Sequence, residues 1–362
     1  MVIAHVIDSM DVGGAEAVVA ALSRLQRQSG HHVSVHCLHS IGAIGERLAA
    51  EGIPVRVHGP AGSMALIWRL YQAFAVLRPD VVHCHNKSAT VHAAPAARLA
   101  GGRLVSTRHG MAAPPYRVRK ELKFWIVAAT LCDRVVAVCE TARRNMLAGA
   151  RRAARNVVTI RNGAYPAAAT GAGRTTGDRF VLVTVGRLVP AKSYGTLLEA
   201  VARARARVPD IALRIVGEGP ERAALERLTA TLALQDVVEF CGERADVGTV
   251  LNGADVFVLS SLSEGLPISI LEAMAAGLPT IATAIGGMPE VLDLSGAGVV
   301  VPPGRPDALA HAIVDLATRR SELGELGRRA RAYYREHFTP ERMADQYLAL
   351  YQTCLAGHRV ES

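Results

Sequence analysis

Short runs of apolar residues alternate with longer stretches of helical period along the whole chain. Two clear helical stretches are 15–28 and 64–77, and the second should end at Arg78 because proline disfavours a helical residue before it. This alternation is typical of parallel sheets with helices on both faces, so we predict an α/β, doubly wound fold. The predicted strands are 2–7, 32–38, 55–58, 81–83, 104–107, 135–139, 157–160, 180–185, 212–216, 237–240, 256–259, 280–282 and 298–301.

The stretch 164–178 is small, nearly uncharged and contains proline and glycine, which favours a linker. With 362 residues, two domains are expected. We predict a first Rossmann-like domain over 1–165, a linker over 166–179 and a second Rossmann-like domain over 180–340. The amphipathic segment 341–362 should form a helix that packs back on the first domain. Doubly wound sheets bind ligands at the carboxyl ends of their strands, so a cleft between the domains is expected.

Composition narrows the class of protein. Half of the residues are hydrophobic and a fifth are charged, as in a well-packed globular protein. The 6 cysteines are scattered without a Cys-x-x-Cys pair, which argues against a zinc site or redox dithiol and fits buried thiols in a reducing cytosol. There is no basic, signal-like start and no run of 18 apolar residues. We therefore expect a cytoplasmic protein.

Charge is distributed unevenly between the halves. Residues 1–170 hold 21 Lys and Arg against 9 Asp and Glu, whereas residues 171–362 hold 20 against 23. A basic first half would attract anionic surfaces. Few aromatic residues and no recognition motif argue against nucleic acid as the partner.

The segment 115–126 combines basic and aromatic residues. Such a mixture suits an interfacial helix on anionic lipid, on the inner face of the plasma membrane. An ordinary helix whose aromatic side chains face the core explains the pattern equally well. The membrane or acceptor candidates are Arg117, Arg119, Lys120, Lys123 and Trp125.

Two features of the first half carry candidate chemistry. Gly13 and Gly14 follow the first strand and open a helix, where backbone N–H groups could meet an anion or simply form a tight turn. His83 and His85 could bind a metal, but no third ligand lies near them in the sequence, and hydrogen-bonded histidines are commoner. His109 is the stronger functional candidate because it ends a strand on a glycine-containing loop. No Asp-x-Asp occurs, so no metal cofactor is expected.

Two groups of charged residues follow strands of the second half. Arg187 and Lys192 leave the strand 180–185 and could clamp a diphosphate, although a solvated turn with incidental charges competes with that interpretation. Glu264 follows the strand 256–259, and Glu272 stands about two turns into a helix that should begin at Pro267. Two carboxylates beside a helix N-terminus suit a polyhydroxylated ligand with a diphosphate.

Several motifs occur in the order typical of one family: Val185-Gly-Arg-Leu, Ile215-Val-Gly-Glu-Gly-Pro, Ser263-Glu-Gly-Leu-Pro, Leu271-Glu-Ala-Met-Ala-Ala-Gly-Leu-Pro and Gly286-Gly-Met-Pro-Glu. With them the chain resembles the retaining glycosyltransferases of family 4, over nearly its whole length. The resemblance implies the GT-B fold of two facing Rossmann-like domains. Two positions depart from the family pattern: Ser193 replaces a usual glycine, and Tyr165 a common aspartate. They affect loop geometry rather than site charge.

The resemblance also implies roles for the candidate residues. Arg187 and Lys192 would neutralise the donor diphosphate, Glu264 would hold the transferred sugar and Glu272 the ribose. The backbone of Gly265, Leu266, Pro267 and Ile268 would line the donor, and the segment containing Gly217 and Glu218 would flank the nucleoside. Gly13 and Gly14 would approach the diphosphate from the first domain. His109 would lie near the sugar and acceptor.

The expected activity is transfer of a hexosyl group from a UDP-, GDP- or ADP-sugar to a hydroxyl with retention. The acceptor would be a lipid-linked glycan in cell-surface or exopolysaccharide synthesis, or a soluble glycan. A nucleotide-sugar 2-epimerase on the same fold, or a non-catalytic nucleotide-sugar-binding protein, remain as alternatives. The donor base, sugar, acceptor, linkage and oligomeric state do not follow from the motifs.

Overall fold

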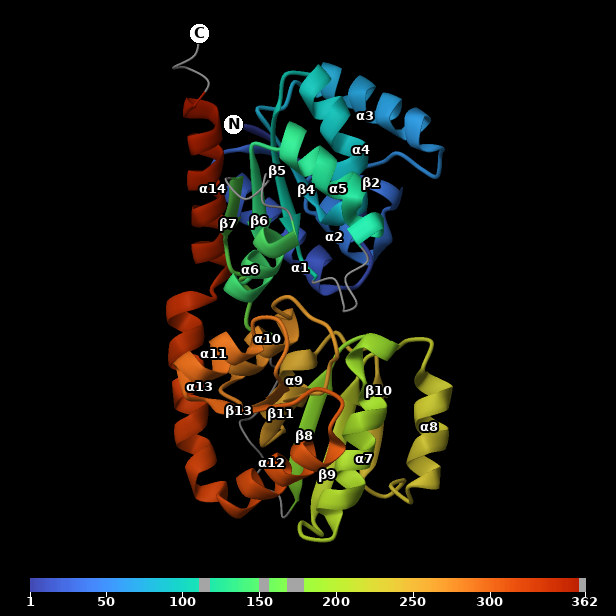
Figure 1. The fold of residues 1–362 in the computed structure, drawn as a ribbon, viewed down its shortest axis with the longest axis vertical. Coiled ribbons are helices and arrows are strands. Elements are labelled where there is room, and N and C mark those ends of the chain that lie inside the picture. The colour runs from blue at the N-terminus through green and yellow to red at the C-terminus, as the bar shows by residue number, and fades with distance from the viewer. Residues whose placement is uncertain (111–117, 150–155, 168–178, 358–362) are drawn as a thin grey trace. The chain divides into compact units, whose positions relative to one another are not determined.

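The computed structural model describes residues 1–110, 118–149, 156–167 and 179–357 (Figure 1). The chain divides into two compact units. The first comprises Met1–Ala164 together with Thr339–Ser362, and the second comprises Tyr165–Phe338. The chain therefore passes between the units twice, once after Ala164 and once after Phe338. Residues 168–178 of the predicted linker lie outside the described residues.

The first unit contains a parallel sheet in the order β3-β2-β1-β4-β5-β6-β7. Its central strands are almost fully buried, which explains their near-continuous apolar sequences. The strands are β1 (Val2–Ser9), β2 (His32–Ser40), β3 (Val55–Val57), β4 (Val81–His85), β5 (Arg103–Arg108), β6 (Arg134–Ala137) and β7 (Val157–Thr159).

The second unit contains a parallel sheet in the order β10-β9-β8-β11-β12-β13. Both sheets reverse their strand order at the first strand, as doubly wound folds do. The strands are β8 (Phe180–Val185), β9 (Ile211–Val216), β10 (Val238–Gly242), β11 (Val256–Leu259), β12 (Thr280–Thr283) and β13 (Gly298–Val301).

Helices follow most of the strands. They are α1 (Gly14–Gln28), α2 (Gly42–Ala50), α3 (Ser63–Leu77), α4 (Asn86–Leu99), α5 (Val118–Leu131), α6 (Glu140–Gly149), α7 (Tyr194–Arg205), α8 (Arg222–Thr231), α9 (Val247–Asn252), α10 (Ile268–Ala276), α11 (Met288–Ser295), α12 (Pro306–Thr318), α13 (Leu323–His337) and α14 (Pro340–Ala356), with 3₁₀ turns at Pro190–Lys192 and Arg320–Glu322.

Neighbouring residues of β5 show which helices cover each face of the first sheet. Ser106 hydrogen-bonds through its Oγ to Thr90 of α4 at 2.7 Å, whereas Thr107 hydrogen-bonds to Tyr347 of α14 at 2.9 Å. Successive side chains of a strand point to opposite faces, so α4 and α14 lie on opposite sides. The C-terminal helix α14 thus covers the sheet of the first unit, beside α1.

Every strand predicted from the sequence is present, with ends that differ by at most two residues. β4 continues beyond the predicted His83 to His85, because His85 pairs with Thr107 of β5. Helix α10 begins at Ile268 rather than at the predicted Pro267. Pro267 is the N-cap, since its ψ of 137° is extended rather than helical.

Candidate functional sites

The first candidate site lies at the carboxyl ends of β8 and β11. These two strands are neighbours in the second sheet, but the order proceeds from them in opposite directions. Loops that leave such a pair diverge and leave room for a ligand. The segments after β8 and β11 carry the predicted residues Arg187, Lys192 and Glu264.

Two glycines after β9 shape the loop that follows β8. Gly217 has a φ of +135°, and a Cβ there would lie 2.2 Å from the carbonyl oxygen of Gly186. A Cβ at Gly219 would lie 2.4 Å from the carbonyl oxygen of Leu188. The Leu188 N–H donates to the carbonyl of Glu218 at 2.8 Å. Only glycine allows this close backbone contact, which positions the loop carrying Arg187.

Lys192 and Glu264 form the centre of this site. The Lys192 ammonium donates to Glu264 Oε1 over 2.5 Å, and both side chains are largely buried. Two adjacent serines after β11 support the pair. Ser260 donates to the Lys192 carbonyl oxygen at 2.9 Å, and Ser261 donates to Glu264 Oε1 at 2.9 Å. A partly buried, multiply hydrogen-bonded ion pair has a defined geometry, which a lone surface pair lacks.

Helix α10 presents its N-terminus next to Glu264. Its first N–H groups have no partner within the helix, and its dipole favours an anion there. Gly277 closes the other end with a φ of +75°, as predicted. Glu272 lies half-buried on this helix, and burial raises the pKa of its carboxyl to about 7.

A third loop closes on the same segment. Gly286 has a φ of +53°, and a Cβ there would lie 2.4 Å from the carbonyl oxygens of both Glu264 and Gly265. The Gly287 N–H donates to the Gly265 carbonyl at 2.8 Å. The Gly-Gly pair before α11 therefore packs directly against the backbone that the sequence predicts to line the donor.

The other predicted residues of this unit are arranged less closely. Arg187 is exposed and makes no ion pair within the described part of the chain. Glu218 is also exposed and pairs with Arg222 at 2.5 Å. Ser193, where a glycine was expected, keeps the left-handed conformation with a φ of 52°.

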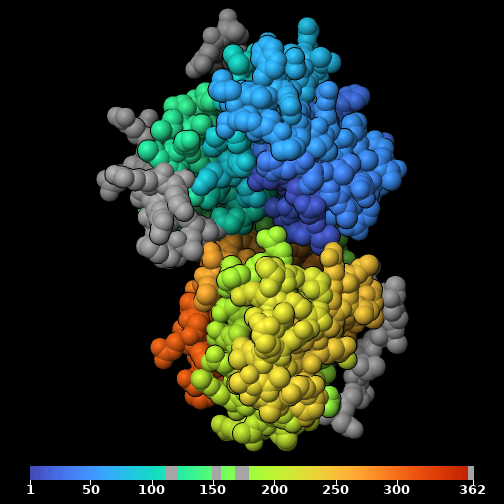
Figure 2. Space-filling model, turned by 90° about the vertical axis from the view of Figure 1, so that its right-hand side faces the viewer, coloured from blue at the N-terminus to red at the C-terminus, as the bar shows by residue number. Residues whose placement is uncertain are grey.

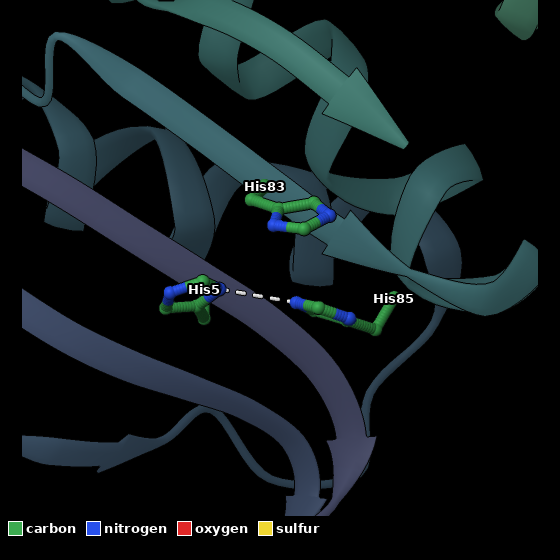
Figure 3. A group of neighbouring side chains, drawn as sticks. All are labelled: His5, His83 and His85. Atoms are coloured by element: carbon green, nitrogen blue, oxygen red, sulfur yellow. Dashed lines mark hydrogen bonds between the residues drawn. The ribbon is translucent and has the colours of Figure 1, made fainter. Parts of the chain in front are cut away.

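The second candidate site lies along β1 and β4 and reaches the carboxyl end of β5, around the predicted histidines. Figure 3 shows His5 of β1 beside His83 and His85 of β4. The expectation that His83 and His85 lack a third neighbour was wrong. His5 lies in register with His83, and one nitrogen from each of the three rings falls within 4.8 Å of the others. Parallel pairing of β1 with β4 brings residues 80 positions apart into contact.

Hydrogen bonds connect this group to His109. His5 Nδ1 lies 3.0 Å from His85 Nε2, and His85 Nδ1 lies 3.0 Å from His109 Nε2. Burial lowers the pKa of His109 to about 4 and the pKa of His85 well below its usual value. These rings are therefore neutral at physiological pH.

Gly13 and Gly14 occupy the start of α1, after β1. Gly14 is the first helical residue and Gly13 its N-cap, with extended backbone. A Cβ at Gly13 would meet only the flexible end of the Glu16 side chain. The structure thus requires no special backbone conformation here, and an anion-binding role for the pair remains a prediction.

The membrane candidates divide between described and undescribed residues. Arg117 lies outside the described residues, as do the side chains of Arg119 and Lys120. On α5, Phe124 is buried beneath Arg108, Trp125 is half-buried and Lys123 is exposed. The described aromatic residues therefore face inward at least in part. Within the described residues, no helix combines the length and apolar character needed to cross a bilayer.

Comparisons with known proteins cover both halves of the chain. Residues 171–333 match the family model of the glycosyl transferases group 1, and residues 12–167 match that of glycosyltransferase family 4. The chain is a group 1 glycosyltransferase. Its two doubly wound units are those of the GT-B fold, as the sequence predicted.

Curated relatives of this glycosyltransferase include a lipopolysaccharide core biosynthesis enzyme and a phosphatidylinositol monomannoside mannosyltransferase. Lipopolysaccharide core biosynthesis glycosyltransferase LpsE of Rhizobium meliloti is 34% identical over 49% of this chain and 51% of that protein. The GDP-mannose-dependent alpha-(1-6)-phosphatidylinositol monomannoside mannosyltransferase of Mycolicibacterium smegmatis is 38% identical over 42% of this chain and 43% of that protein. The chain therefore spans about half the length of these relatives.

The fold is also that of solved structures. Anabaena Alr3699/HepE in complex with UDP-glucose superposes with a TM-score of 0.85, over 98% of this chain and 100% of that one. The sequence identity is 22%. At this identity the likeness establishes the fold of the glycosyltransferase.

Proposed function

We propose that the glycosyltransferase moves a hexosyl group from a nucleoside-diphosphate sugar to a hydroxyl of a lipid-linked glycan, with retention at the anomeric carbon. The observation that carries this proposal is the Lys192–Glu264 pair beside the N-terminus of α10. It combines a cation and a helix dipole for a diphosphate with a carboxylate for sugar hydroxyls.

Bond cleavage would place negative charge on the departing diphosphate and positive charge on the sugar ring. Lys192, the exposed Arg187 and the α10 N-terminus would stabilise the diphosphate without need of a metal. Glu264 would accept hydrogen bonds from the sugar, and Glu272 from the ribose. The leaving phosphate would take the acceptor proton during attack on the same face.

The acceptor belongs, in this proposal, to the basic first unit. Helix α3 carries no acidic residue and exposes the large apolar side chains Met64, Trp68 and Val76. Its light-blue atoms lie open at the surface of the first unit (Figure 2). On α5, Leu122 and Ile126 are exposed as well. Exposed apolar residues in a basic unit suit peripheral binding to anionic lipid.

A donor panel tests the transfer. The full chain is mixed with UDP-, GDP- and ADP-sugars, and thermal shift and sugar release are measured with and without a polyprenyl-diphosphate-linked acceptor. We expect one nucleotide class to raise the melting temperature and the acceptor to increase turnover. Release of free nucleotide without any glycosylated product would favour the 2-epimerase, and binding without turnover a non-catalytic protein.

Sedimentation with anionic liposomes at low salt tests the membrane part separately. We expect the wild-type chain to pellet with the vesicles and Trp68→Ser to pellet less. A matched exposed change in the second unit, Leu294→Ser, should have no effect. A wild-type chain that stays in the supernatant would favour a soluble acceptor.

A further inference from the structure

A line of buried polar side chains crosses the first unit from α1 to His109. Gln26 Oε1 lies 2.8 Å from His5 Nε2, and His5 continues to His85 and His109 through contacts of 3.0 Å each. Figure 3 shows the central contact, between His5 and His85. Gln26, His5 and His85 are all 0% exposed. Water therefore has no access to these three side chains.

The three rings are neutral, and neutral imidazole donates from one nitrogen and accepts at the other. Burial lowers the pKa of His5 to about 4, and those of His85 and His109 are lowered as well. Every hydrogen bond along the line must then point in the same direction. The direction at one end sets which nitrogen of His109 carries the proton.

Gln26 determines that direction. Its amide nitrogen donates to Tyr351 Oη of α14 over 3.5 Å, and the Tyr351 hydroxyl lies 2.6 Å from His83 Nδ1. The amide oxygen therefore faces His5 and accepts from its Nε2–H. His5 Nδ1 must then accept from His85, and His85 Nδ1 must accept from the Nε2–H of His109.

The line ends at a ring nitrogen that carries no proton, Nδ1 of His109. His109 Nδ1 is buried and has no hydrogen-bond partner among the described residues. The opposite direction would place a buried N–H there without an acceptor, which costs more than an unused lone pair. A buried polar atom without a partner in the protein is a place for a ligand's polar group.

We propose that Gln26, His5 and His85 are positioning residues that hold His109 in its Nε2–H form, so that Nδ1 accepts a hydrogen bond from a ligand hydroxyl. A group that can donate a hydrogen bond, such as an ammonium or a hydroxyl, can therefore bind at this nitrogen, whereas a pure acceptor cannot. The hydroxyl belongs to the sugar or acceptor, which rests on the function proposed above.

The same histidines could instead hold a metal ion, but the hydrogen bonds oppose it. His83 uses both nitrogens, with Tyr351 at 2.6 Å and Thr107 at 2.7 Å. His5 and His85 hydrogen-bond to each other. A divalent ion would need free lone pairs from all three rings, and none of their hydrogen-bond partners is a carboxylate that could balance its charge.

Imidazole nitrogen resonances of the ligand-free, full-length chain test the inference directly. With ¹⁵N-histidine labelling and assignment through His109→Gln, the wild type should show His109 protonated at Nε2 alone. Gln26→Met removes the deciding acceptor at similar size, and His109 should then show both forms. Ser23→Ala changes another buried polar residue on α1 outside this line and should leave His109 unchanged.

Protonation of His109 at Nδ1 in the wild type would overturn the inference, as would an unchanged His109 in Gln26→Met. One equivalent of zinc retained by the purified wild type and lost in His83→Phe would overturn it too. In transfer assays, Gln26→Met should lower kcat/KM about tenfold, the value of one lost hydrogen bond. Since the resonances are recorded without ligand, an absence of transfer with every donor would overturn only the proposed function.

Discussion

The candidate sites of the two sheets differ in how they hold polar groups. At the carboxyl ends of the second sheet, which we call the charged edge, Lys192 forms an ion pair with Glu264 that serine hydroxyls hold in place. In the first sheet the corresponding group, which we call the neutral edge, is the hydrogen-bonded line of the neutral histidines His5, His85 and His109. One strand architecture thus supports a charged site in one unit and an uncharged one in the other. The charged edge suits an anionic diphosphate, and the neutral edge suits hydroxyl groups.

Acid should destabilise the first unit much more than the second, and this is the largest difference that we expect between them. Burial lowers the pKa of His5 to about 4 and of His36 to about 3, against an ordinary value of 6.5. The unfolded chain therefore binds protons first, so the first unit keeps its stability above pH 6.5 and loses it as the pH falls toward 4. Protonation of each of these buried histidines lowers the free energy of unfolding by roughly 3 kcal/mol or more.

Both tryptophans, Trp68 and Trp125, belong to the first unit, so their fluorescence reports its unfolding alone. Hydrogen exchange of second-unit peptides gives the comparison. The exposed His311 of the second unit supplies a control, since His311→Gln should change neither transition. Simultaneous loss of both units at the same pH would contradict the contrast.

The charged edge should fail when either partner of its ion pair is removed. We expect Lys192→Ala or Glu264→Gln to reduce kcat/KM about 100- to 1000-fold, because each removes charge stabilisation or positioning at the reacting groups. Steady-state transfer with the preferred donor measures this. Glu226→Gln, an exposed change on α8, is the matched control. Full turnover in either variant would remove this edge from catalysis.

Glu272 should show a smaller effect whose size depends on pH. Burial raises its pKa to about 7, so its protonated form is favoured in the folded state. The stability that this protonated carboxyl gives the folded state is complete below pH 4.5 and is lost as the pH rises through 7. At pH 8, Glu272→Gln should stabilise the second unit by roughly 1–3 kcal/mol while weakening donor binding. Denaturant unfolding at pH 4.5 and pH 8 tests this, and equal effects at both would refute it.

Ser193 should give the smallest effect. Its left-handed backbone, with a φ of 52°, strains a residue other than glycine. Ser193→Gly should therefore raise the stability of the second unit by about 1 kcal/mol or less, offset in part by the lost hydrogen bond to Thr196 at 2.9 Å. Ser193→Val should lower it instead. Melting temperatures of the two variants decide the matter, and the same sign for both would exclude backbone strain.

The sequence located the charged edge well because its parts are local. Glu264 and Pro267 stand next to a strand whose bounds, Val256–Leu259, were predicted without error. Gly277 ends α10 in the expected left-handed conformation. Ser260 and Ser261 were missed, although they lie between that strand and Glu264. Their hydroxyls matter only because the Lys192 loop comes to rest against them.

The neutral edge was the harder one to predict. Gln26, His5 and Tyr351 stand on separate elements, and Tyr351 lies 325 positions from Gln26. Gln26 stands between Leu25 and Arg27 and Tyr351 between Leu350 and Gln352, and neither surrounding indicates a shared polar site. The pairing of β1 with β4 and the docking of α14 create the line, and no spacing along the chain encodes either contact.

The sequence by itself determined the alternation of strands and helices, the family and the residues that carry charge, because these depend on local period and on motifs within single loops. The tertiary structure alone decided that Lys192 pairs with Glu264 while Arg187 stays exposed, and that three histidines meet at the core of the first sheet. The physical reason is that parallel pairing sets neighbours by strand order and register, which are properties of the whole fold.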